Sequence, residues 1–153
     1  MATDDLYFFE DFPIGGEFPL DPYPVTREAV IEFASEFDPQ GIHLDDEIAE
    51  ASILGALAAS GWHTCSIMMR MICDSFIHKT ASLGAASVEE VRWLKPVFPG
   101  NTLSGTARVL EKRVSASRPH VGIITIQYEL FNEAGEKVMT ARTPGFMRLR
   151  EVA

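Results

Sequence analysis

The sequence is poor in cysteine and in basic residues, and it has no long apolar run. Cys65 and Cys73 are its two cysteines, and their spacing fits neither a CxxC pair nor a zinc ribbon, which favours reduced thiols in a cytoplasmic protein. Its 13 lysines and arginines face 22 acidic residues, so the net charge of −9 argues against nucleic acid or an anionic membrane as the main partner. No stretch approaches the ~20 apolar residues of a membrane span, and the opening MATDDLYFFEDF lacks the pattern of a signal peptide.

Internal repeats and low-complexity linkers are also absent. The length of 153 residues is about that of one domain, and the hydrophobic share of 46% is that of a folded chain. We therefore expect a single domain over residues 1–153.

The first half of the chain has helical patterns and the second half has strand patterns. Thr26 is a candidate N-cap for a helix ending at Asp38-Pro39, and apolar residues from about Ser60 to Ile77 predict a long, buried helix. We also expect a short strand and turn in residues 6–20, a short helix in 44–51, strands in 86–94, 102–114, 122–132 and 137–150, and a hairpin turn at Asn132 to Gly135. This order is typical of an α+β fold with an antiparallel sheet packed around one long helix.

The stretch FDPQGIH, residues 37–43, joins an aspartate to a histidine across a forced turn. Pro39 cannot continue a helix and biases Asp38 away from helical geometry, whereas Gly41 frees the backbone again. A carboxylate and an imidazole aimed at one small volume can work as a general acid/base pair, so Asp38 and His43 are candidate catalytic residues. A solvated polar turn would produce the same spacing.

The stretch ASGWHT, residues 59–64, opens the long helix. A helix N-terminus presents unpaired N–H groups and partial positive charge, and Gly61 has no Cβ to block a ligand from the backbone. Such N–H donors and partial positive charge can polarise a carbonyl oxygen. Alternatively, Ser60 only caps the helix and Gly61 only eases packing.

Together, FDPQGIHLDDEIAEASILGALAASGWHT and VRWLKPVFPGNTL resemble the MaoC-like dehydratase family, which includes the (R)-specific enoyl-CoA hydratases. The family motif D-x-N-P-x-H matches this chain at Asp38 and His43, A-H-G-M matches at Ala59 to Trp62, and P-V-x-x-G-D-T matches at Pro96 to Thr102. The chain lacks the Asn-Pro pair of the first motif. It has Ser60 in place of the histidine, and Trp62 in place of the methionine, of the second.

The resemblance implies a hot-dog fold, in which a curved antiparallel sheet wraps a long helix. It implies catalysis by Asp38 and His43, with the substrate bound at Ser60, Gly61 and Trp62. The implied reaction is reversible hydration of a 2-enoyl thioester of the acyl-CoA type, with no metal or redox cofactor, in a homodimer or higher homo-oligomer. Acyl-CoA thioester hydrolysis by a hot-dog thioesterase and non-catalytic thioester binding are the alternatives.

Several other polar and sulfur-containing residues have ordinary structural interpretations. His63 is expected to be a hydrogen-bonded core histidine, and Asp45 and Asp46 to be helix caps and dipole partners rather than metal ligands of His43. Met68, Met69 and Met71 are expected to fill the core. Basic residues of the strand half could bind coenzyme A phosphates or simply form a solvated sheet edge: Arg92, Lys95, Lys112, Arg113 and Arg118.

Overall fold

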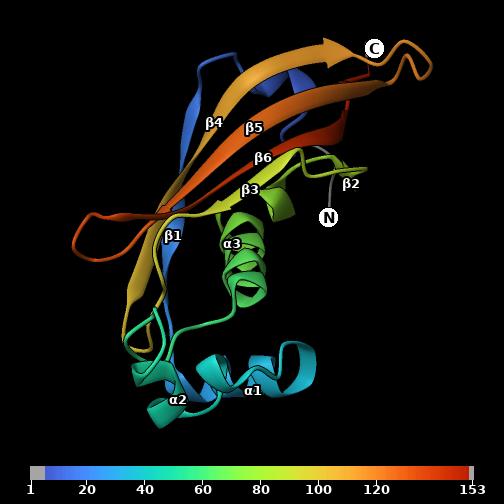
Figure 1. Cartoon of the computed structure of the whole chain (residues 1–153). Coiled ribbons are helices and arrows are strands. Elements are labelled where there is room, and N and C mark those ends of the chain that lie inside the picture. Colours follow the sequence, from blue (N-terminus) through green and yellow to red (C-terminus); the bar gives the residue numbers. More distant parts are fainter. Residues whose placement is uncertain (1–5, 152–153) are drawn as a thin grey trace.

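A computed structural model describes residues 6–151 of the chain. Short 3₁₀ segments cover Phe9–Asp11, Gly41–His43 and Ile77–Lys79. The helices and strands run in the order β1 (Glu17–Pro24), α1 (Arg27–Phe37), α2 (Asp46–Glu50), α3 (Gly61–Ser75), β2 (Ser82–Ala85), β3 (Glu90–Trp93), β4 (Thr102–Val114), β5 (Val121–Phe131) and β6 (Lys137–Arg148) (Figure 1).

All six strands form one antiparallel sheet in the order β1-β4-β5-β6-β2, with β3 also paired to β6. The strands β2 and β3 therefore share one edge of the sheet. β2 lies beside Gly145 to Met147, whereas β3 lies beside Met139 to Arg142. β1 forms the opposite edge.

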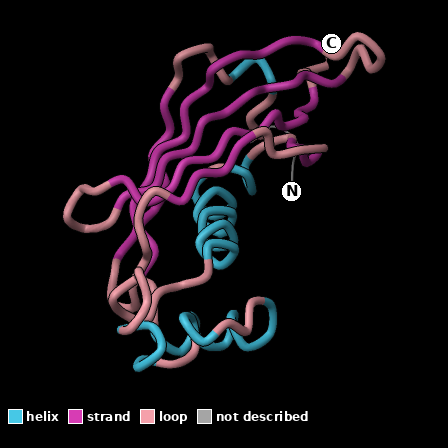
Figure 2. The backbone as a smooth tube through the Cα atoms, viewed as in Figure 1, coloured by secondary structure: helices cyan, strands magenta, loops and turns pink. Residues whose placement is uncertain are grey.

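The helix α3 lies against the inner face of the curved sheet, while α1 and α2 sit at one end of it (Figures 1 and 2). Alternate residues of β5 point inward, so Ile124 and Leu130 are almost fully buried, in one core cluster with Met71 of α3. The outward residues between them are only partly covered. This architecture confirms the expected α+β hot-dog fold.

Most predicted elements are confirmed. Thr26 caps α1 by accepting a hydrogen bond from the Ala29 N–H, and the hairpin turn closes where Asn132 N–H donates to Glu136 O. In α3, the two charged residues pair with each other, since Arg70 Nε lies 2.7 Å from Asp74 Oδ2.

Two predictions about the strands need correction. The opening segment forms a 3₁₀ turn before β1 begins at Glu17, because Phe9 and Phe12 turn into the core instead of extending along the sheet. The strand β2 is missing from the prediction, since its four residues, SLGA, have little strand character of their own. Within residues 6–151, no helix is long and apolar enough to span a membrane.

Candidate functional site

The site begins where α1 ends. Asp38 is the C-cap of α1, and its N–H still donates to Ala34 O at 2.9 Å, before Pro39 stops the helix. The following 3₁₀ turn packs tightly against α2, since a Cβ on Gly41 would lie 2.8 Å from Ile48 Cδ1. Glycine at position 41 therefore lets the turn carry His43 back toward the end of α1.

The turn brings the predicted acid and base together. The Nε2 atom of His43 lies 3.4 Å from Oδ2 of Asp38, and the His43 side chain is 9% exposed. His43 Nδ1 lies 2.7 Å from the Ala58 carbonyl oxygen. Because a carbonyl only accepts hydrogen bonds, Nδ1 carries a proton and donates it to Ala58 O, which leaves Nε2 directed toward Asp38.

Two further side chains hold the Asp38 carboxylate. Ser60 Oγ donates to Oδ2 at 2.6 Å, and Gln40 Nε2 donates to Oδ1 at 2.6 Å. These hydrogen bonds, first from Ser60 and then from Gln40, favour the ionised form and hold the pKa of Asp38 below its ordinary value. Sequence reasoning missed Gln40, although its place inside the turn was a signal that it faces the same carboxylate.

The start of α3 forms the second wall of the site. Ser60 is fully buried, and its hydroxyl oxygen also accepts from the Trp62 N–H at 3.3 Å, so it caps the helix as well as holding Asp38. Thr64 N–H donates to Ser60 O at 3.0 Å. Among the described residues, no hydrogen bond engages the N–H of Gly61 or of His63. These two donors are therefore free to meet an acceptor.

Trp93 of β3 lies where Gly61 has no side chain. A Cβ at position 61 would lie 2.6 Å from Trp93 Cε2, and Trp93 Nε1 donates to Gly61 O at 2.9 Å. The Trp62 ring meets the Trp93 ring edge-on at 5.3 Å, with 61% of Trp62 exposed. Gly61 thus serves packing at its side-chain position. Sequence reasoning missed Trp93, because nothing in the local pattern says that β3 passes beside α3.

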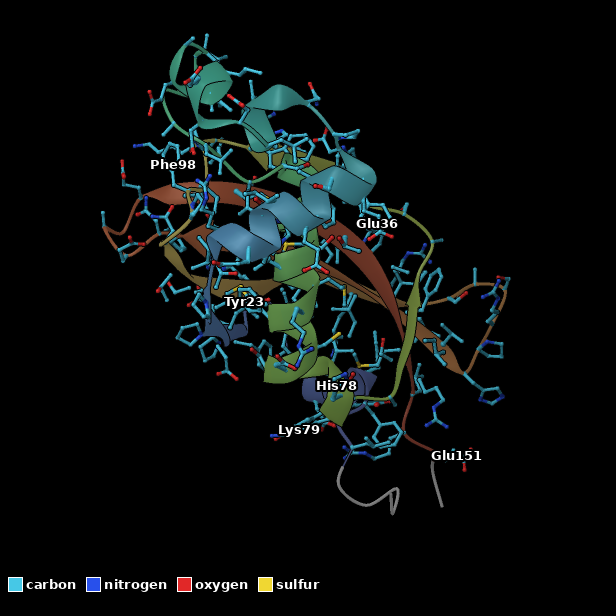
Figure 3. All side chains as sticks on the ribbon, turned by 90° about the horizontal axis from the view of Figure 1, so that it is seen from below. Tyr23, Glu36, His78, Lys79, Phe98 and Glu151 are labelled. Atoms are coloured by element: carbon cyan, nitrogen blue, oxygen red, sulfur yellow. The ribbon has the colours of Figure 1, made fainter. Side chains whose placement is uncertain are left out.

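His63 closes the site toward α1. Its ring stacks on Phe33 at 4.8 Å, and it is 7% exposed. The expected hydrogen bond is absent at Nδ1, which is buried without a partner among the described residues. Burial lowers the pKa of His63, so the ring is neutral near pH 7. Figure 3 looks onto this end of the molecule, where α1 lies across α3 and Glu36 marks the last turn of α1.

Most of the remaining candidates take structural roles. Asp45 caps α2 through the Ile48 N–H, and Asp46 pairs with Arg27 at 2.7 Å. No group of three or more metal-binding side chains gathers within residues 6–151. Met68 and Met71 are buried as expected, but the prediction is wrong for Met69, which is exposed.

Three of the five basic residues of the strand half have partners. Arg92 pairs with Glu90, Lys95 pairs with Glu136, and Lys112 donates to the carbonyls of Phe9 and Phe12.

Comparison with known proteins adds the family. The model of the MaoC like domain matches residues 11–129. A crystal structure of the MaoC-like dehydratase from Rhodospirillum rubrum superposes with a TM-score of 0.87 at 37% identity, covering 95% of this chain and 99% of that one. An uncharacterized protein, YdeM of Bacillus subtilis, is 28% identical over 84% of this chain and 90% of its own length. Mesaconyl-CoA hydratase of Cereibacter sphaeroides is 28% identical over this whole chain, which spans 44% of that protein.

Proposed function

Because the chain belongs to the MaoC-like hydratase and dehydratase family, we propose that it catalyses the reversible addition of water to a 2-enoyl thioester, giving the (3R)-hydroxyacyl product. The observation that carries the proposal is the pairing of a part-buried Asp38 with a buried His43 at the end of α1, facing the start of α3. The relative named as a mesaconyl-CoA hydratase supports a CoA thioester as the substrate class.

The geometry of the pair suits one water molecule. Asp38 Oδ2 and His43 Nε2 are both acceptors when the imidazole is neutral, and their separation of 3.4 Å is too long for a good direct hydrogen bond. A water has two protons to donate, so it satisfies both atoms at once and keeps a lone pair of its oxygen for attack. His43 is held in this tautomer by the Ala58 carbonyl.

The proposed addition of water proceeds in two steps. As the water oxygen bonds to C3 of the substrate, one of its protons passes to the Asp38 carboxylate, and the electrons of the C2–C3 double bond move into an enolate. C2 then takes a proton from the Asp38–His43 pair, with His43 orienting the exchange, and the carboxylate is restored. Positioned acid/base catalysis of this type contributes about 10²–10⁴-fold in rate.

The enolate oxygen needs donors that are strongest when its charge develops. The N–H groups of Gly61 and His63 have no partner in the described chain, and they stand in the first turn of α3, where the helix dipole favours negative charge. We assign the thioester carbonyl to this turn. Loss of one such donor in an enzyme typically costs about 3 kcal/mol of transition-state stabilisation.

The experiment is a substrate panel that separates addition from hydrolysis. Purified protein is mixed with trans-2-enoyl-CoAs of different length and branching, and the conjugated-thioester absorbance and free thiol are followed in one cuvette. Loss of absorbance without thiol release, with 3R product on chiral analysis, is the expected result. Thiol release without hydration would replace the proposal with thioester hydrolysis, and binding without either reaction would identify a thioester-binding domain.

A further inference from the structure

A cleft lies on the outer face of the sheet, away from α3. The strand register places Arg113 of β4 opposite Ile123 of β5, and Ile123 opposite Phe146 of β6. Ile124, the next residue along β5, points into the core, so this row of three side chains points outward. The row forms an apolar floor with an arginine at one end.

The β4–β5 hairpin loop forms the wall of this cleft. Its conformation is held by Ser115 N–H donating to Val121 O at 2.8 Å and by Val121 N–H donating to Arg118 O at 2.9 Å. The Arg118 guanidinium lies 6.0 Å from the centre of the Phe146 ring. The resulting cleft has a volume of about 290 Å³ and is lined by Arg113, Ser115, Ala116, Ser117, Arg118, Val121, Ile123 and Phe146.

The charge around the cleft is unusual for a chain of net charge −9. Within residues 6–151, no ion pair engages Arg113 or Arg118, whereas Arg27, Arg70 and Arg142 all have carboxylate partners. Arg148 of β6 lies opposite Val121 of β5; it is exposed and also has no ion pair within residues 6–151. Glu111 of β4 lies opposite Thr125 of β5, on the same outer face, but does not line the cleft. Three guanidinium groups without an ion-pair partner in the described residues therefore gather around the cleft.

We propose that this cleft binds a small organic phosphate of the nucleotide type. The phosphate lies between Arg113 and Arg118, which offer forked donors suited to phosphate oxygens, and the hydroxyls of Ser115 and Ser117 supply further donors. The flat base packs on Phe146. The cleft volume of about 290 Å³ lies just below the usual range for ligand sites, so the cleft encloses only part of a nucleotide.

The cleft is separate from the Asp38–His43 site. The β4–β5 hairpin loop projects at the end of the sheet opposite to α1 and α2 (Figure 1), and the cleft opens on the face opposite to α3. The proposal therefore does not depend on the proposed hydration, and either one can fail alone.

The test uses ADP as the probe and calorimetry with backbone-amide NMR on the full chain. ADP is expected to bind and to shift the amides of residues 115–123 and 145–147. Arg113→Gln or Arg118→Gln is expected to weaken binding at least about tenfold, because each removes a charged hydrogen-bonding partner of the phosphate. Arg108→Gln, exposed on the same strand and face but outside the cleft, is the matched control and should bind as wild type.

Further arms separate the parts and sources of the ligand. Pyrophosphate should bind more weakly than ADP, and adenosine should not bind, since one lacks the base and the other the phosphate. If Arg118→Gln increases the KM for an enoyl-CoA, the bound nucleotide is that of coenzyme A. If the KM is unchanged, the ligand is a free nucleotide. The proposal would be overturned by any of three results: ADP does not bind, ADP shifts only amides near Asp38, or both arginine variants bind ADP as tightly as wild type.

Discussion

Ser60 is the residue on which the two halves of the site depend. Its hydroxyl donates to Asp38 Oδ2 and accepts from the Trp62 N–H, so one side chain fixes the carboxylate and caps α3. In the A-H-G-M motif of the MaoC-like family, a histidine stands at this position. The Ser60 hydroxyl favours the ionised form of Asp38, while the imidazole of His43 lies beside the same oxygen, Oδ2, at 3.4 Å.

Replacing Ser60 with alanine tests this arrangement. The pKa of Asp38 is below its ordinary value in the folded protein, so the carboxylate stays ionised, and contributes stability, until the pH falls through that lowered value. Ser60→Ala removes the first cause of the shift, so the ¹³C titration of the Asp38 carboxyl should move to higher pH. Loss of the cap should also cost about 1 kcal/mol of unfolding free energy. Ser66→Ala, which removes a hydrogen bond to Trp62 O, should leave the titration unchanged.

His63 gives a prediction about pH and stability. Burial lowers its pKa in the folded protein, so the unfolded chain binds the proton more readily below the ordinary value of about 6.5, and stability falls as the solution is acidified. His63→Phe keeps the stacking on Phe33 and removes the titrating group. The decrease in Tm between neutral and mildly acidic pH should become shallower in this variant by scanning calorimetry. A slope equal to that of wild type would show that other groups cause the decrease.

At the scale of the elements, the contact between α3 and β3 shapes the start of the helix. Gly61→Ala would place a methyl group 2.6 Å from Trp93 Cε2, so the indole must move and its hydrogen bond to Gly61 O is lost. Overpacking of this type costs about 1–3 kcal/mol. If packing is the reason for glycine here, Trp93→Ala should recover part of that loss in a double-mutant cycle measured by denaturant unfolding. Additive effects would contradict it.

The elements also show how far sequence reasoning reaches. The end of α1 at Asp38, the cap at Thr26 and the alternation of β5 follow from local patterns, and the structure has all three. β2 is too short to have a pattern of its own and exists because β6 offers it hydrogen bonds. In the site, the turn that brings Asp38 toward His43 could be predicted. The positions of Trp93 and of the His63 ring depend on long-range packing, and no local signal encodes them.

At the scale of the whole molecule, the edge formed by β2 and β3 exposes apolar side chains: Leu83, Val88, Trp93 and Leu94. Unpaired strand edges and exposed apolar groups favour association, so we predict a homodimer through this edge. Val88→Glu should raise the dissociation constant of the dimer at least about tenfold in sedimentation equilibrium, because the interface would bury a charge. Ile14→Glu, also exposed but in the turn before β1, should have no effect. A fully active monomeric wild type would contradict the prediction.

The central claim is that Asp38 and His43 activate one water, and kcat on the best enoyl-CoA substrate tests it most directly. Asp38→Asn keeps the shape of the side chain but removes the base, and His43→Asn keeps a donor near Nδ1 for the Ala58 carbonyl but removes Nε2. Each variant, with an unchanged circular dichroism spectrum, should lose about 10²–10⁴-fold in kcat. A folded Asp38→Asn protein that hydrates the substrate at the wild-type rate would contradict the mechanism.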